Sequence, residues 1–159
     1  MSLTQRVVAV VILALLGVDS GLRAQTLKEG ELANIKALKC TFPVSTVVMW
    51  KDGVPEPRIR TTEPLAIEIN EIDAADGSAI IGPVASGNSD VNVQVYGWNI
   101  HFLEVGRGGR IGVTTVFAQI ATGDKLKATH TRTDYLAADP NAKPEPMVAM
   151  YYGECEARR

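Results

Sequence analysis

The sequence predicts an all-β protein: an antiparallel meander of eight or nine strands that closes, or nearly closes, into a barrel. Three observations carry this prediction. Apolar and polar residues alternate along most of the chain after residue 36, glycine-containing turn sequences separate the alternating segments, and one cysteine lies near each end of the pattern. Alternation gives each strand one apolar face and one solvated face, as in antiparallel sheets.

The first 24 residues are predicted to be a secretory signal peptide. A single basic residue, Arg6, precedes an uncharged apolar run at residues 7–18, and the small residue Ala24 stands just before Gln25. The run has 12 residues, whereas a membrane-spanning helix needs about 20. We therefore expect one mature β domain at residues 25–159, in the periplasm or secreted.

The mature chain is mildly acidic. Removing residues 1–24 removes Arg6, Arg23 and Asp19, so the formal net charge changes from −2 to −3. The remaining charges are scattered, so neither nucleic acid nor an anionic membrane surface is expected as a partner. The 135 residues that remain are enough for one hydrophobic core and too few for two.

The predicted elements follow one another along the mature chain. Residues 27–33 are polar and predict a short helical turn or an irregular lead-in, and the turn at residues 96–99 divides a long β stretch in two. The predicted strands include residues 38–42, 46–51, 65–69, 91–95, 111–120, 126–135 and 147–155.

Turn sequences and prolines separate these strands. Hairpin turns are predicted at residues 52–53, 76–77, 87–88, 106–109 and 122–124. Two proline-rich segments, residues 54–64 and 139–146, are expected to be connections or edge strands, because proline cannot donate a hydrogen bond to a ladder.

Cys40 and Cys155 predict a disulfide bond, since an even pair in an exported protein normally forms one. A metal site made of cysteines needs more ligands, and a redox motif places its two cysteines close in sequence. The bond would place the first strand beside the last, which favours a closed barrel. A two-sheet sandwich can also bring its ends together and remains the alternative.

The candidate site begins on the strand at residues 126–135. Its inward face is predicted to run Leu126, Ala128, His130 and Arg132, and an inward imidazole and guanidinium both need partners. One interpretation is a polar anchor at the end of a ligand cavity. The other is that this face emerges into solvent at the strand end and leaves both side chains at the rim.

Neighbouring strands supply the other candidate residues. Glu104 has the parity of Phe102, and Gln119 has the parity of Phe117, so either could be an acceptor for the basic side chains. The candidate ligand-binding residues are His130, Arg132, Glu104, Phe117 and Trp50.

Other chemistries are less well supported. His101 lies on the opposite face from His130, so no metal site is expected from the histidines. Residues 107–110 (RGGR) lack the ending of a P-loop and predict a hairpin tip with two exposed arginines. No nucleophile elbow or paired carboxylates stand out, so we expect no enzyme, no cofactor and no metal.

Four motifs carry a resemblance: residues 39–42 (KCTF), 112–117 (GVTTVF), 127–132 (KATHTR) and 151–156 (YYGECE). Together they resemble a group of small exported bacterial β proteins, over nearly the whole mature chain. The resemblance implies the same disulfide and no particular activity. Residues 133–135 (TDY) are also similar to a short lipocalin motif, but the Gly-x-Trp of that family is missing before Trp50. The likeness to lipocalins is therefore one of architecture.

These observations predict an exported, non-enzymatic β-barrel that binds a small apolar molecule, with His130 and Arg132 near the end of the pocket. The alternative is a structural or protein-interaction module of the cell envelope with a filled core.

Overall fold

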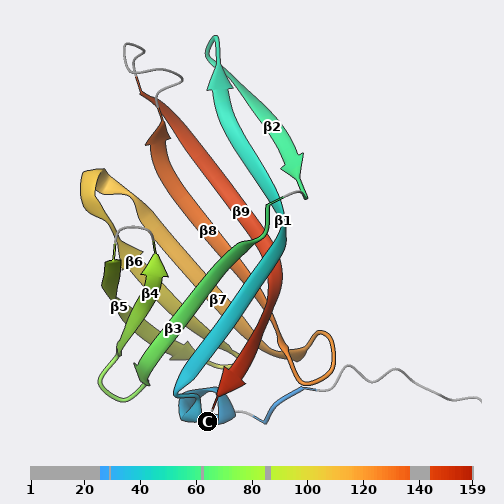
Figure 1. Cartoon of the computed structure of the whole chain (residues 1–159), viewed down its shortest axis with the longest axis vertical. Helices are drawn as coiled ribbons and strands as arrows, with labels where there is room; N and C mark the ends of the chain where they lie inside the picture. Colours follow the sequence, from blue (N-terminus) through green and yellow to red (C-terminus); the bar gives the residue numbers. More distant parts are fainter. Residues whose placement is uncertain (1–25, 29, 62, 85–86, 137–143, 159) are drawn as a thin grey trace, which may run out of the picture.

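The computed structural model describes residues 26–28, 30–61, 63–84, 87–136 and 144–158. The predicted signal peptide, residues 1–24, lies outside the described residues. Eight antiparallel strands close into a barrel, and one extra strand is attached at its edge (Figure 1). The predicted closed meander is confirmed.

The elements occur in the order of a meander. A 3-10 helix, η1 (Glu31–Asn34), precedes the strands, and a second, η2 (Arg107–Gly109), lies between β6 and β7. The strands are β1 (Ala37–Lys51), β2 (Val54–Arg60), β3 (Leu65–Asp73), β4 (Ser78–Val84), β5 (Gly87–Tyr96), β6 (Asn99–Val105), β7 (Ile111–Ile120), β8 (Leu126–Leu136) and β9 (Glu145–Arg158).

Strand β1 belongs both to the barrel and to an extension of it. Its first half pairs with β3 and its second half with β2, while β9 pairs with it along both halves. The strand β2 therefore lies outside the closed barrel. Together β2, β1, β9 and β8 extend past the other strands, as the top of Figure 1 shows. The two segments predicted at residues 38–42 and 46–51 form this single strand.

A β-bulge in β1 lies between Thr41 and Val44, opposite Gly153 of β9. The backbones approach so closely there that a Cβ at Gly153 would lie 2.0 Å from the Thr41 carbonyl oxygen and 2.7 Å from the Phe42 Cα. Only glycine fits this position. The bulge bends β1 from the barrel into the extension.

The disulfide bond joins the first and last strands, as predicted. Cys40 of β1 lies directly opposite Cys155 of β9, with 4.0 Å between their Cα atoms. Both side chains are completely buried inside the barrel. The bond therefore fastens the seam at which the barrel closes.

Apolar side chains fill the barrel over most of its length, and η1 covers one end with Leu32 and Ile35. This packed interior is the main hydrophobic core. Its strand residues are Leu38, Cys40, Phe42, Ile67, Ile69, Ile72, Ala79, Ile81, Val91, Val93, Ile100, Phe102, Val116, Ala118, Leu126, Ala128 and Cys155.

The proline-rich residues 54–60 form the edge strand β2, one of the two outcomes that the prolines predicted. A two-residue turn joins β1 to β2 and pairs Lys51 with Val54. Because hydrogen-bonded and non-bonded pairs alternate from there, the nitrogens of Pro55 and Pro57 face away from β1. The outer edge of β2 therefore lacks two donors, which hinders pairing with another strand.

Among the described residues, no helix is long and apolar enough to span a membrane.

Candidate ligand site at the open end of the barrel

At the end of the barrel opposite η1, polar side chains replace the apolar ones. Glu104 of β6, Gly112 of β7 and Arg132 of β8 are neighbours across the three strands. One row deeper, Thr114 of β7 lies opposite His130 of β8. We call this end of the barrel the mouth.

His130 lies at the boundary between the mouth and the core. Its ring is 6% exposed, shares a 2.9 Å hydrogen bond with the Thr114 hydroxyl, and packs between the rings of Phe42 and Tyr151 at 6.1 and 5.7 Å. Burial lowers the pKa of His130 to about 4, and the positive charges of Arg132 and Arg110 add to the effect. The imidazole is therefore neutral at neutral pH.

Gly112 gives the mouth the space that its polar groups occupy. A Cβ at this position would lie 3.2 Å from the His130 Cε1 and 3.4 Å from the Glu104 Oε2. Any larger residue would press on both side chains. The absence of a side chain at Gly112 therefore leaves room for the Glu104 carboxylate of β6 and the His130 imidazole of β8 to approach each other over β7.

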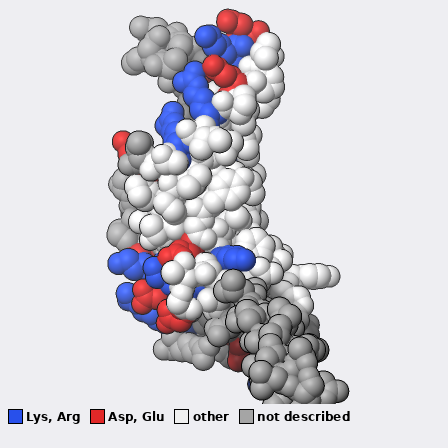
Figure 2. Space-filling view, turned by 90° about the vertical axis from the view of Figure 1, so that its right-hand side faces the viewer, with Lys and Arg blue, Asp and Glu red and all other residues white. Residues whose placement is uncertain are grey.

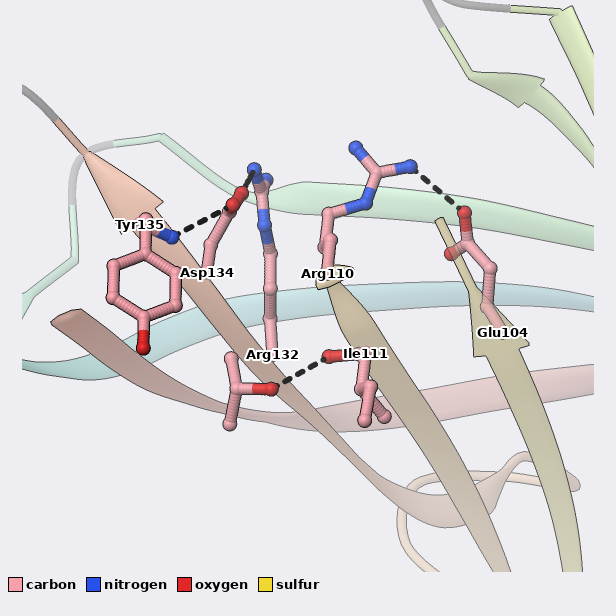
Figure 3. A network of polar contacts seen from close by, with 7 residues as sticks. Glu104, Arg110, Ile111, Arg132, Asp134 and Tyr135 are labelled. Atoms are coloured by element: carbon pink, nitrogen blue, oxygen red, sulfur yellow. Dashed lines mark hydrogen bonds and ion pairs between the residues drawn. The ribbon is translucent and has the colours of Figure 1, made fainter. Parts of the chain in front are cut away.

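Four charged side chains form two ion pairs around the mouth (Figure 3). The Arg110 Nη2 donates to the Glu104 Oε1 at 3.0 Å, and the Arg132 Nη2 donates to the Asp134 Oδ2 at 2.5 Å. The hydrogen bond from Arg132 is the main cause that lowers the pKa of Asp134. In Figure 3 the four side chains follow the order Asp134, Arg132, Arg110 and Glu104.

One donor of the mouth has no partner. The Arg132 Nε is buried and makes no hydrogen bond within the part of the chain that the structure describes. Buried donors are normally satisfied by protein or water, so an unsatisfied one calls for a physical reason.

A second, smaller apolar cluster lies beside the charged groups. It consists of Val47, Met147 and Ala149, with Met49 and Tyr151 packed against it. In the strand register, Ala149 is opposite Arg132 and Met147 is opposite Asp134. The inner face of the extension therefore places an apolar wall directly next to the ion pairs.

Three of the five predicted site residues come together at the mouth: His130, Arg132 and Glu104. The inward parity predicted for β8 is right, since His130 is buried, whereas the Arg132 side chain, 36% exposed, reaches the rim. Glu104 is nearly buried and accepts from Arg110.

The placement of Phe117 at this site is wrong. Its neighbours Val116 and Ala118 are buried, so Phe117 faces outward from β7, and Gln119 lies on the same outer wall. Phe117 and Tyr152 instead line an outer hollow of about 400 Å³ over β7, β8 and β9. Both faces of β7 carry apolar residues, so alternation along this strand does not show which face is buried.

The placement of Trp50 with His130 is also wrong. Trp50 lies in the extension, opposite Pro55 and one residue from the turn into β2. Its parity is opposite to that of Val47 and Met49, which belong to the inner apolar cluster. The length of β1 beyond the barrel carries this side chain away from the mouth.

The structure adds Arg110, which the sequence placed at an exposed hairpin tip. Its side chain is only 29% exposed and turns back to Glu104. Arg110 precedes the first residue of β7, so the alternation of that strand does not predict its direction. The side chain of Arg107 is outside the described part.

Within the described ranges, no group of three or more His, Cys, Asp or Glu side chains is placed to hold a metal ion. No protein-family model matches the chain, and no curated protein is similar to it. The resemblance to exported bacterial β proteins therefore stays a prediction.

Proposed function

We propose that this protein is an exported, non-enzymatic β-barrel that binds a small, largely apolar molecule at the mouth. One observation carries the proposal: the partly exposed side chains of Arg132 and Arg110 lie next to the apolar wall of the extension. A small molecule with one polar end would bind to their exposed donors and contact Met49, the half-buried residue packed against the wall. Few polar groups beside an apolar surface are the usual make-up of a ligand site.

The packed interior argues for the mouth over the barrel centre. Core residues up to the level of Phe102 and Val116 are completely buried, and the His130 ring closes the core from the polar side. A ligand therefore binds above His130, against the extended strands. This differs from carriers that enclose their ligand within the barrel.

The environment of His130 supports a role in binding over catalysis. Its hydrogen bond goes to the Thr114 hydroxyl, and Thr114 is completely buried, so no substrate reaches that oxygen. The lowered pKa makes the imidazole a weak base at neutral pH. The buried disulfide at the barrel seam is compatible with export to an oxidising compartment.

Native mass spectrometry tests the proposal. The protein is purified from its own cell envelope or medium, without detergent, and its mass is compared before and after unfolding. We expect an additional small mass that is lost on unfolding and is reduced in Arg132→Gln. Finding only the mass of the bare chain in every preparation would contradict the proposal.

A separate observation favours a second candidate, a protein-interaction module that pairs with a second copy of itself. Two neighbouring rows across the outer face of β2, β1, β9, β8, β7 and β6 carry no charged residue. Uncharged surface also fills the middle of Figure 2, with charged side chains above and below it. The most exposed members of the rows are Ile59, Leu103, Val105, Ile111, Val148 and Met150.

The size of this outer face limits how tightly two copies would associate. Six strands span about 24 Å, so two rows offer a few hundred Å², less than the roughly 800 Å² per partner of a stable interface. We expect weak, salt-insensitive self-association that Val148→Lys abolishes. Sedimentation velocity over a wide concentration range measures it, and a strictly monomeric protein throughout would rule it out.

A further inference from the structure

The charged groups of the mouth follow the order acid, arginine, arginine, acid: Asp134, Arg132, Arg110 and Glu104 (Figure 3). The four formal charges cancel overall. The charge of Arg110 also lowers the pKa of Asp134, the partner of Arg132, so the two ion pairs lie near each other. In the order of Figure 3 the two positive charges occupy the centre of the group and the two negative charges its ends. Neighbouring guanidinium groups repel each other, and an anion between them relieves that repulsion.

Both arginines have unused donors. A guanidinium group has five N–H donors in a planar fork, and the ion pairs with Glu104 and Asp134 each use one nitrogen. The Arg132 and Arg110 side chains are 36% and 29% exposed, so part of each can be reached from outside. The exposed donors suit a planar acceptor, since a carboxylate can accept two parallel hydrogen bonds from a guanidinium fork.

Neighbouring titratable groups report the same positive field. Arg132 and Arg110 both lower the pKa of His130, although Glu104 and Asp134 lie close by. Both arginines also help to lower the pKa of Asp134. The charges of both arginines therefore act at His130 and at Asp134.

The flanking acids also limit the charge of the anion. Glu104 and Asp134 would repel a second negative charge, and each remains within hydrogen-bonding distance of its arginine. A monoanion such as a carboxylate fits this balance better than a dianionic phosphate. The wall next to Arg132 is apolar, with Ala149 and Met147 in the adjacent strand.

We infer that the ligand of the mouth is a monoanionic organic carboxylate, whose head binds to the exposed donors of Arg110 and Arg132 and whose short apolar tail lies against the half-buried Met49. This inference rests on the proposed function and adds the chemical class of the ligand. It also assigns a binding role to Arg110, which pairs with Glu104 in the free protein.

The test is an NMR titration of the mature chain with hexanoate and with its neutral counterpart, hexanamide. Hexanoate should shift the amide signals around Arg132 and Ala149 saturably, and hexanamide should bind about tenfold more weakly or less, because hydrogen bonds to a charged group are the stronger ones. Equal binding of both probes at the mouth would overturn the carboxylate head and leave the proposed function intact. No shift with either probe up to about 20 mM, a concentration that detects very weak binding, would overturn the inference, and native mass spectrometry then decides the proposed function separately.

Variants separate a binding role from a structural one. Arg110→Gln and Arg132→Gln should each weaken hexanoate binding about tenfold. Arg58→Gln is the matched control, because Arg58 is also paired with an acid, Glu56, on the inner face of the extension but is far more exposed. Asp134→Asn should strengthen binding severalfold, because it removes a competing carboxylate. Weaker binding in Asp134→Asn, or an equal loss in Arg58→Gln, would overturn the inference.

Discussion

The burial of His130 makes the stability of this protein depend on pH in a way that the structure specifies. His130 is 6% exposed, its ring lies between two aromatic rings, and it shares a hydrogen bond with Thr114. Burial first, and then the charges of Arg132 and Arg110, lower its pKa from 6.5 to about 4. The unfolded chain has none of these effects.

The sign of the dependence follows from proton binding. Between pH 6.5 and pH 4 the unfolded chain holds a proton on His130 that the folded chain does not hold, so the free energy of unfolding falls as the pH is lowered. Above pH 6.5 the imidazole is neutral in both states and contributes no slope. A pKa lowered from 6.5 to about 4 corresponds to about 3 kcal/mol, all of it lost below pH 4.

The measurement is urea unfolding at a series of pH values from 4 to 7.5, for the wild type, His130→Gln and His101→Gln. Glutamine at position 130 can keep a hydrogen bond to Thr114 but cannot be protonated. The change in stability with pH should be about 3 kcal/mol smaller in His130→Gln than in the wild type. His101, hydrogen-bonded to Thr115 on the outer wall at 3.0 Å, provides the matched control.

Only the slope is compared, so a loss of stability in His130→Gln at every pH does not affect the result. The protein has two histidines, and an NMR titration of their ring protons gives a second readout. A His130 signal that titrates near pH 6.5 in the folded protein would refute the reasoning. So would identical slopes for the wild type and His130→Gln.

Three further predictions concern the closure and the edge of the barrel. Replacing Cys40 and Cys155 together by alanine opens a loop of 115 residues and should cost about 4–5 kcal/mol in urea unfolding; a loss below about 1 kcal/mol would contradict the entropic account. Gly153→Ala should lower the free energy of unfolding by about 3 kcal/mol or more, because its Cβ meets the Thr41 carbonyl. Gly123→Ala, in open space at positive φ, is the control and should lower it by only about 1 kcal/mol. Equal losses in the two variants would refute the steric argument. Replacing Pro55 and Pro57 by valine restores two donors to the edge of β2, so light scattering should show association that the wild type lacks; an unchanged monomer would show that these prolines do not protect the edge.

Alternation predicts most of the strands, because each barrel strand has one buried and one solvated face. It misses β4, in which Ile80 and Ile81 are consecutive and the buried positions are Ala79 and Ile81. It also divides β1 at Pro43, where the bulge adds one residue and shifts the parity. Local irregularities of this kind depend on the partner strand and are not encoded in the period of one segment.

The parity of single strands also predicts only part of the candidate site. The parity of β6 and β8 correctly placed Glu104 and His130 inside the barrel. Parity alone does not show where along its length a strand leaves the barrel. It therefore groups Trp50 with His130, although Trp50 lies in the extension, opposite Pro55. Arg110 precedes the first residue of β7, and its approach to Glu104 depends on the conformation of the connection, which periodicity does not describe.

The unequal lengths of the strands explain why the proposed ligand site lies at this end of the barrel. Strand β6 ends at Val105 and β7 begins at Ile111, whereas β8 continues to Leu136 and β1 to Lys51. The inner face of the longer strands therefore continues past the point where the opposite wall stops. Apolar side chains on that face need a cover, and the stems of long basic residues can supply one while their charged ends reach water. Arg132 is adjacent to Ala149 in the register, so the proposed ligand, with an acidic head and an apolar tail, would bind to the Arg132 guanidinium group and take over part of that cover.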